Sequence, residues 1–324
     1  MLVSAADIEA SFRDAAERRG LAIKRLCADG TLHRCDAAGK HGKGDGAYLL
    51  HLDGVPAGGF ENHRDGLGWQ TWRADIRQVL SQEERAAYRA KIEGERRTRE
   101  AARQRTLEEA RRKAAWIVKQ STAASPEHPY LVRKRVQPHG LRNYRGLLLV
   151  PMRTLDGKLR SLQFISPESG KRFLRGGATT GCLYGIGRAV PPGPIAVVEG
   201  FATGGSIYEA TGIPVAVAFD SGNLLPVARA LRAKYPAAVI VVCADDDWRR
   251  RNPVTGKLEN IGTIKACEAA NAIGAVVAIP AFGEARGEGD TDFNDLACRV
   301  GAEAVRERIN LALRIAGEEV RQCA

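Results

Sequence analysis

Acidic residues follow three apolar segments of the C-terminal part of the chain, the last of them after a Gly-rich loop. They are Glu199, the triplet Asp245, Asp246 and Asp247, and the pair Asp292 and Asp295. Carboxylates that converge repel one another, and a hard divalent cation such as Mg²⁺ or Mn²⁺ relieves that repulsion. These residues therefore indicate metal-dependent chemistry. In an extended chain, Asp245 and Asp247 would point one way and Asp246 another. The alternative for Asp246 is a helix cap or a solvated loop.

Alternating strands and helices would position these carboxylates. Beyond the proline-rich segment 191–194, the sequence predicts four strands separated by helices. The strands are 195–198, 214–219, 238–244 and 275–280, and the helices are 201–211, 224–235, 262–273 and a closing helix over 295–315. This order predicts an α/β fold with a mainly parallel sheet that is covered by helices. Ligands of such sheets bind outside the carboxyl ends of the strands, where the acidic residues fall.

Three segments precede this predicted α/β domain of residues 191–324. Residues 1–80 predict a small α+β domain, with a helix over 7–19 and strands near 31–34, 47–52 and 68–73. Residues 81–120 predict a long, charged and solvated connecting helix, because few of its positions are apolar. Residues 121–190 predict a basic, β-rich subdomain with strands over 147–152, 159–165 and 171–174. Trp69 and Trp72 fall in opposite phases, so one can be buried while the other is free to stack on a base.

Positive charge is concentrated in the middle of the chain. The 324 residues carry a net charge of +11, yet residues 85–119 carry +7 and residues 120–189 carry +9, whereas both flanking regions are slightly acidic. Such a surplus favours a polyanionic partner. Six side chains are the candidates for contacts with nucleotide phosphates or DNA, the alternative for each being an ordinary solvated charge. They are Arg160, Lys171, Arg172, Arg175, Arg249 and Arg250.

Several short motifs resemble a known family. Val197-Val-Glu-Gly200, Asp245-Asp-Asp247 and Asp292-Phe-Asn-Asp295 are similar to the three motifs of the Toprim domain. The closer resemblance is to primase-like Toprim proteins of plasmids, phages and integrative elements. It includes Ala218-Phe-Asp-Ser-Gly-Asn-Leu224 and reaches upstream to the N-terminal segment. Each motif alone is short, but their order and their position at predicted strand ends agree.

The resemblance implies a nucleotidyltransferase, a DNA primase that makes short RNA primers on single-stranded DNA from nucleoside triphosphates. It implies that Glu199 acts in acid–base chemistry or metal positioning. Asp245 and Asp247 match a metal-binding pair, and Asp292 or Asp295 would complete a Mg²⁺ or Mn²⁺ site. A separate replicative helicase would be a further partner. Two alternatives stay open: a metal-dependent nuclease that uses the same carboxylates, and a DNA-binding accessory protein with an idle site.

Other signals weigh against further classes of protein. No run of 18 apolar residues is present, so no membrane partner is expected, and seven scattered cysteines suit a reducing cytoplasm. Zinc is not expected, because the spacing of Cys27, His33, Cys35 and His41 matches no common zinc finger. The sequence between Trp248 and Asn260 departs from the Toprim pattern, which has a small residue shortly after the aspartate pair.

Overall fold

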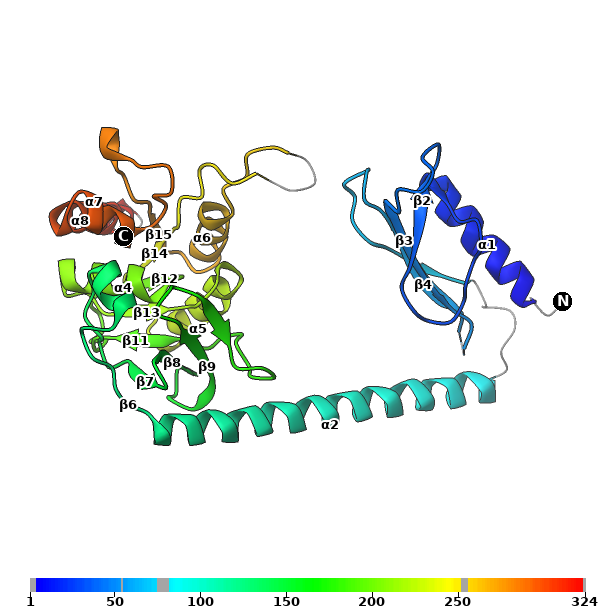
Figure 1. Cartoon of the computed structure of the whole chain (residues 1–324), viewed down its shortest axis with the longest axis horizontal. Helices are drawn as coiled ribbons and strands as arrows, with labels where there is room; N and C mark the ends of the chain where they lie inside the picture. The colour runs from blue at the N-terminus through cyan, green and yellow to red at the C-terminus, as the bar shows by residue number, and fades with distance from the viewer. Residues whose placement is uncertain (1–3, 54, 75–81, 252–255, 323–324) are drawn as a thin grey trace. The chain divides into compact units, whose positions relative to one another are not determined.

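The computed structural model describes residues 4–53, 55–74, 82–251 and 256–322. The chain divides into two units, one of residues Met1–Glu100 with Arg251–Lys257, and one of Ala101–Arg250 with Leu258–Ala324. Figure 1 shows the course of the chain through both. Within the described residues, no helix is long and apolar enough to cross a membrane. The finer division at residues 80, 120 and 190 stays a prediction.

The first unit has the predicted α+β composition. Its elements are α1 (Ala5–Arg18), β1 (Leu21–Ala22), β2 (His33–Ala37), β3 (Gly46–His51), β4 (Ala57–Asn62) and β5 (Gln70–Arg73). The strands pair antiparallel in chain order. Strand β4 was not predicted, because glycines 58 and 59 interrupt its apolar pattern. Strands β3 and β4 pair antiparallel; the Asp53-Gly54 step between them is typical of a hairpin turn, but Gly54 lies outside the described residues.

The two tryptophans of this unit differ as their phases predicted. Trp72 packs edge-on against Phe12, with ring centroids 5.2 Å apart, on the core beneath α1. Trp69 is 42% exposed. It lies over Gly59, where a Cβ atom would come within 2.4 Å of the Trp69 indole nitrogen.

Helix α2 (Gln82–Gln120) is long and charged, as predicted, but its last turns are not fully solvated. Ala110, Ala114 and Ile117 are buried against strands of the next sheet. Trp116, although it is one of the few large apolar residues of this helix, is 54% exposed. The prediction of a fully solvated helix was therefore wrong. The buried residues recur at i, i+4 and i+7, on one face of the helix, but most are alanines, which give little hydrophobic signal in the sequence although they allow close packing.

The basic subdomain is a five-stranded antiparallel sheet in the order β10-β9-β8-β7-β6. Its elements are β6 (Thr122–Ala123), α3 (Pro129–Lys134), β7 (Arg142–Tyr144), β8 (Leu147–Arg153), β9 (Leu159–Ile165) and β10 (Lys171–Phe173). Helix α2 covers one face of this sheet. The other face contributes Leu148, Val150 and Ile165 to a core that it shares with the α/β domain, so the two pack as one body within the second unit.

The α/β domain has the predicted mainly parallel sheet, in the order β11-β13-β12-β14-β15. Its strands are β11 (Tyr184–Ile186), β12 (Ile195–Val198), β13 (Val215–Val217), β14 (Ile240–Cys243) and β15 (Val276–Ala278). Its helices are α4 (Phe201–Thr211), α5 (Leu224–Lys234), α6 (Ile261–Asn271), α7 (Phe293–Arg299) and α8 (Ala302–Gln322), with short 3₁₀ turns η1 (Ser221–Asn223) and η2 (Gly283–Ala285). Only β11 runs antiparallel to its neighbour, while the other four strands are parallel.

Helices cover both faces of the parallel sheet. Residues of α4, α7 and α8 pack on one face and residues of α5 and α6 on the other. The single closing helix expected over 295–315 was wrong, since it is two helices that are separated at Gly301. Gly301 has a φ of +115°, a backbone conformation that side-chain-bearing residues rarely adopt, so the chain turns there.

The packing of α2 makes a prediction about stability. Replacing Ile117, which is 4% exposed, by alanine should lower the free energy of unfolding by about 2–4 kcal/mol, because it leaves a cavity between α2 and the sheet. Replacing the more exposed Trp116 by alanine should cost less. Urea unfolding followed by circular dichroism measures both. Equal losses would contradict the packing described here.

Candidate active site

Glu199 and Asp245 leave neighbouring strands at nearly the same level. Strands β12 and β14 are parallel and adjacent, with Val197 paired to Val242. Glu199 follows β12 directly, and Asp245 follows β14 after Ala244, whose N–H still bonds to the carbonyl of Ala278. The two carboxylates therefore emerge at the same carboxyl edge of the sheet, as the sequence predicted.

Several carboxylates influence one another at this edge. Burial raises the pKa of Glu199 to about 7; Lys171 opposes the shift, and Asp247, Asp220 and Asp292 add to it. Burial and the neighbouring charges of Asp292, Glu199 and Asp247 raise the pKa of Asp245 well above its ordinary value. Burial also raises the pKa of Asp292. The site thus holds acidic side chains that lack sufficient counter-charge from the protein.

One atom tests whether these residues fit a metal ion. Oδ1 of Asp245 is buried and has no hydrogen-bond partner, which is costly for a carboxylate oxygen unless something else binds it. In the described part of the chain, no three His, Cys, Asp or Glu side chains are already grouped as a metal site. The all-oxygen donor set fits a hard divalent cation in its chemistry, and the side chains would have to close around the ion.

The three aspartates of the triplet have different surroundings. Asp246 forms a 2.7 Å ion pair with Arg286 and accepts a hydrogen bond from Asn260, so it fixes the loop. Asp247 accepts a long hydrogen bond of 3.3 Å from the backbone N–H of Gly262 at the start of α6. This contact fixes the Asp247 side chain at the N-terminus of α6.

Gly262 lets α6 approach the aspartate loop closely. A Cβ atom at this position would lie 2.3 Å from the carbonyl oxygen of Asp245, which is too short for any contact. The first turn of α6 therefore packs directly on the backbone that carries Asp245. Only glycine permits this arrangement without moving the loop.

Asp292 and Asp295 form a capping box at the start of α7. Oδ1 of Asp292 accepts a 2.8 Å bond from the backbone of Asp295, and Oδ2 accepts a 3.0 Å bond from the hydroxyl of Thr203 on α4. Asp295 accepts a bond from the backbone of Thr291 and pairs with Lys134 at 3.3 Å. Both oxygens of each carboxylate thus have a partner. Asp292, unlike Asp295, acts electrostatically on both Glu199 and Asp245, so it is the better placed of the two for a metal.

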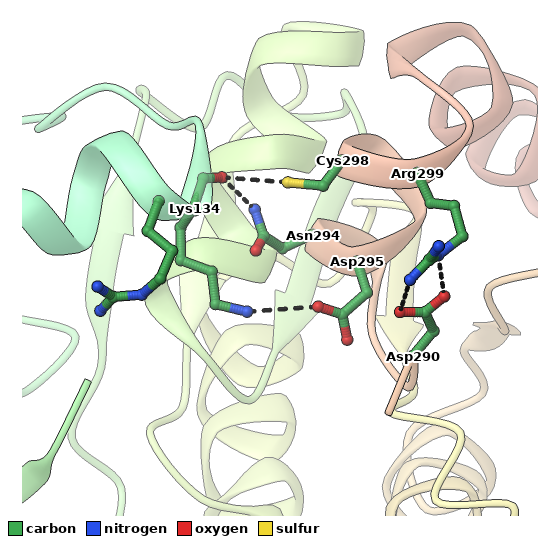
Figure 2. A pocket seen from close by; sticks show the side chains of 7 residues that line it. Lys134, Asp290, Asn294, Asp295, Cys298 and Arg299 are labelled. Carbon is green, nitrogen blue, oxygen red and sulfur yellow. Dashed lines mark hydrogen bonds and ion pairs between the residues drawn. The ribbon is translucent and has the colours of Figure 1, made fainter. Parts of the chain in front are cut away.

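A pocket of about 590 Å³ flanks the site beyond Asp295, between α3 and α7 (Figure 2). Its lining residues are Arg133, Lys134, Asp290, Asn294, Asp295, Cys298 and Arg299. Asn294 donates a 2.6 Å bond to the carbonyl of Lys134, and the Lys134 side chain reaches Asp295. These contacts dock the basic subdomain on α7. The sequence did not predict that Lys134 and Thr203 contact the acidic residues. Asn294 could have been found, because it lies inside the third acidic motif.

The predicted basic residues divide into two groups. The ammonium of Lys171 acts on Glu199 and Asp245 and lies near Gly200, so Lys171 belongs to the site. Arg172 lies on the opposite face of β10, with its guanidinium 5.3 Å from the centre of the Phe164 ring. Arg160 interacts electrostatically with Glu108 of α2 and with Cys182, and Arg175 is exposed.

The arginines that follow the triplet have acidic partners. Arg249 pairs with Glu288 at 2.7 Å, and Arg250 lies 3.7 Å from Oδ2 of Asp247. Arg250 therefore partly balances the aspartates. A phosphate contact by either arginine stays a prediction.

Comparison with known proteins agrees with this geometry. Residues 194–303 match the family model of the Toprim domain. This part of the chain, with its parallel sheet and three acidic motifs, is therefore a Toprim domain.

The relatives narrow the class. The chain is 33% identical over 285 residues to a DNA primase TraC of Escherichia coli, covering 85% of this chain and 26% of that protein. A second DNA primase TraC of Escherichia coli is 34% identical over 272 residues, covering 79% of this chain and 18% of that protein. The chain thus contains a Toprim domain and is similar over most of its own length to these primases, and the resemblance seen in its motifs is confirmed. It spans about a quarter or less of the length of these relatives.

Two solved structures of primase domains align with parts of this chain. The primase fragment of the bacteriophage T7 primase-helicase protein aligns with a TM-score of 0.43 and 13% identity, covering 59% of this chain and 75% of that one. The DnaG primase catalytic domain bound to single-stranded DNA aligns with a TM-score of 0.38 and 17% identity, covering 60% and 62%.

The raised pKa of Glu199 predicts how stability depends on pH without metal. A carboxyl group whose pKa rises on folding contributes stability below its unfolded pKa and loses that contribution as pH rises through the folded value. Glu199→Gln, which cannot ionise, should therefore match the parent chain near pH 4.5. It should be more stable by about 1–3 kcal/mol above pH 7.

Denaturant unfolding in EDTA at several pH values measures this difference. The matched control is Glu127→Gln, an exposed glutamate away from the site, whose difference from the parent should stay near zero throughout. A constant difference for Glu199→Gln across the pH range would contradict the assignment of the shift to this residue.

Proposed function

We propose that this chain is a metal-dependent nucleotidyltransferase of the DNA primase type, joining ribonucleotides into short primers on single-stranded DNA. The observation that carries the proposal is the buried, unpartnered oxygen of Asp245, surrounded by Glu199, Asp247 and Asp292 and faced by Lys171. Similarity to the two TraC primases supports it. A separate helicase would provide the unwound template.

The carboxylates have distinct roles in this proposal. Asp245, Asp247, Asp292 and Glu199 would hold Mg²⁺ or Mn²⁺. A bound divalent cation supplies the charge neutralisation and Lewis acidity that phosphoryl transfer requires. Burial raises the pKa of Glu199 to about 7 in the metal-free chain, and a bound cation would lower it, so Glu199 would hold the metal as a carboxylate.

Lys171 provides the fixed positive charge of the site. Phosphoryl transfer builds negative charge on the phosphate oxygens, which a positioned Lys or Arg stabilises. Lys171 is on β10, at the sheet edge beside Glu199, so it can bind a triphosphate that bridges the carboxylate site and the basic subdomain. Arg175 is exposed on the same segment and would extend the positive surface along which template phosphates bind, whereas Arg172 lies on the opposite face of β10.

The decisive test is primer synthesis. The full chain is incubated with single-stranded DNA, labelled nucleoside triphosphates and Mg²⁺ or Mn²⁺, and short labelled products are separated by size. Glu199→Gln and Asp245→Asn should each lower product formation by about 100-fold or more, because they remove charge where the metal and phosphates meet. Asp156→Asn, at an exposed aspartate paired with Lys158, is the control and should retain activity.

Other outcomes of this assay would overturn the proposal. Shortened template without nucleotide incorporation, lost in the same variants, would show a nuclease. Unchanged DNA binding with neither product would show an accessory protein whose site is idle.

Binding of single-stranded DNA should depend on salt through the basic subdomain. Each neutralised phosphate contributes about −0.7 to the slope of log affinity against log salt for single strands. Arg175→Ala should therefore make the slope less negative by about that amount. Arg111→Ala, which removes the same charge from an arginine already paired with Glu108, should change it little. Fluorescence anisotropy at several salt concentrations measures both, and equal effects would argue against a template surface at Arg175.

A further inference from the structure

Strand β10 presents an exposed aromatic ring beside the carboxylate site. Lys171 and Phe173 are two residues apart on this strand, so their side chains share one face, while Arg172 points to the other. Phe173 is 40% exposed. The spacing along the strand is about 6.6 Å. The ring therefore shares one face of β10 with the ammonium that acts on Glu199.

Phe173 rests on a second aromatic residue with an unusual backbone. Its ring centroid is 6.4 Å from that of Phe219, with the planes at 81°. Phe219 is 7% exposed and has a φ of +77°, a left-handed conformation that is costly for an aromatic residue. Such conformations persist only where surrounding contacts enforce them, and they concentrate at functional sites.

The surrounding contacts fix Phe219 to the strand end that carries Glu199. The N–H of Phe219 donates to the carbonyl of Glu199 at 2.8 Å. The buried side chain of Asn223 donates to the carbonyls of Ala218 and Cys182. The segment 218–224, to which no role has been assigned so far, thus holds an aromatic support at a defined distance from the catalytic carboxylates.

We propose that Phe173 is a stacking surface for the base of the nucleotide whose phosphates bind at Lys171. This inference rests on the proposed function, because it places the triphosphate at the carboxylate site. Every nucleobase has a π-face, so stacking on a ring tolerates any base, as copying a template requires. In a nucleotide the ribose lies between the phosphates and the base. Lys171 and Phe173 are two residues apart on one face of β10, so the first can bind the phosphates while the second contacts the base.

The occupant is a nucleotide because charge and shape agree at this edge. Lys171 provides a cation for the phosphates, and the exposed ring provides apolar area for the base. Phe219, which belongs to the buried core, packs edge-on against this ring. A template base on the same ring is the alternative that the experiment must separate.

Equilibrium binding to the full chain in Mg²⁺ tests the inference with three probes: ATP, tripolyphosphate, which lacks a base, and an oligo-dT strand. Phe173→Ala and Phe173→Leu should weaken ATP binding about 5- to 150-fold, and Phe173→Trp should preserve it, because Leu is apolar but has no π-face. Tripolyphosphate binding should not change in these variants. Lys171→Ala should weaken both ATP and tripolyphosphate.

The remaining outcomes are decisive as well. If the parent chain binds ATP and tripolyphosphate equally tightly, the triphosphate site of the proposed function stands and the stacking inference fails. Equal ATP binding by the Leu variant and the parent would show that position 173 needs only an apolar side chain, and it would overturn the stacking inference. Loss of oligo-dT binding alone would assign the ring to the template. If the parent binds neither ATP nor tripolyphosphate, the triphosphate site itself is wrong, and the inference falls with it.

Discussion

Mutual repulsion among half-buried carboxylates is the constraint on which the rest of this site depends. Glu199, Asp245 and Asp292 all have raised pKa values, and one oxygen of Asp245 has no partner. A fold does not keep such groups together for stability, since each one loses hydration without full compensation. The fold therefore loses electrostatic stability by presenting negative charge at one edge of the sheet.

The supporting contacts come from segments far apart in the chain. Thr203 on α4 holds Asp292, and Lys134 on α3 holds Asp295. The basic subdomain and the Toprim domain also share one hydrophobic core. As a result, Lys171 on β10 is carried by a sheet that cannot shift independently of the carboxylates. Positive and negative groups of the site are thus held by packing as well as by charge.

Sequence reasoning located the strand ends and the acidic residues well, because apolar runs and the residues that follow them are local features. Strand β12 and helix α4 have the predicted bounds. The buried alanine stripe of α2 was missed, since alanine carries little hydrophobic signal, and so was the break at Gly301. The contacts of Lys134 with Asp295 and of Thr203 with Asp292 join residues that are 161 and 89 positions apart. No local pattern could have indicated them.

The glycine at position 262 makes the aspartate motif dependent on a residue outside it. A single methyl group there would meet the Asp245 carbonyl at 2.3 Å and displace the loop. A related protein could therefore keep every acidic residue and still lose the geometry that makes them useful. When the motif is used to judge whether such proteins are active, the residue at the start of the following helix should be inspected together with the aspartates.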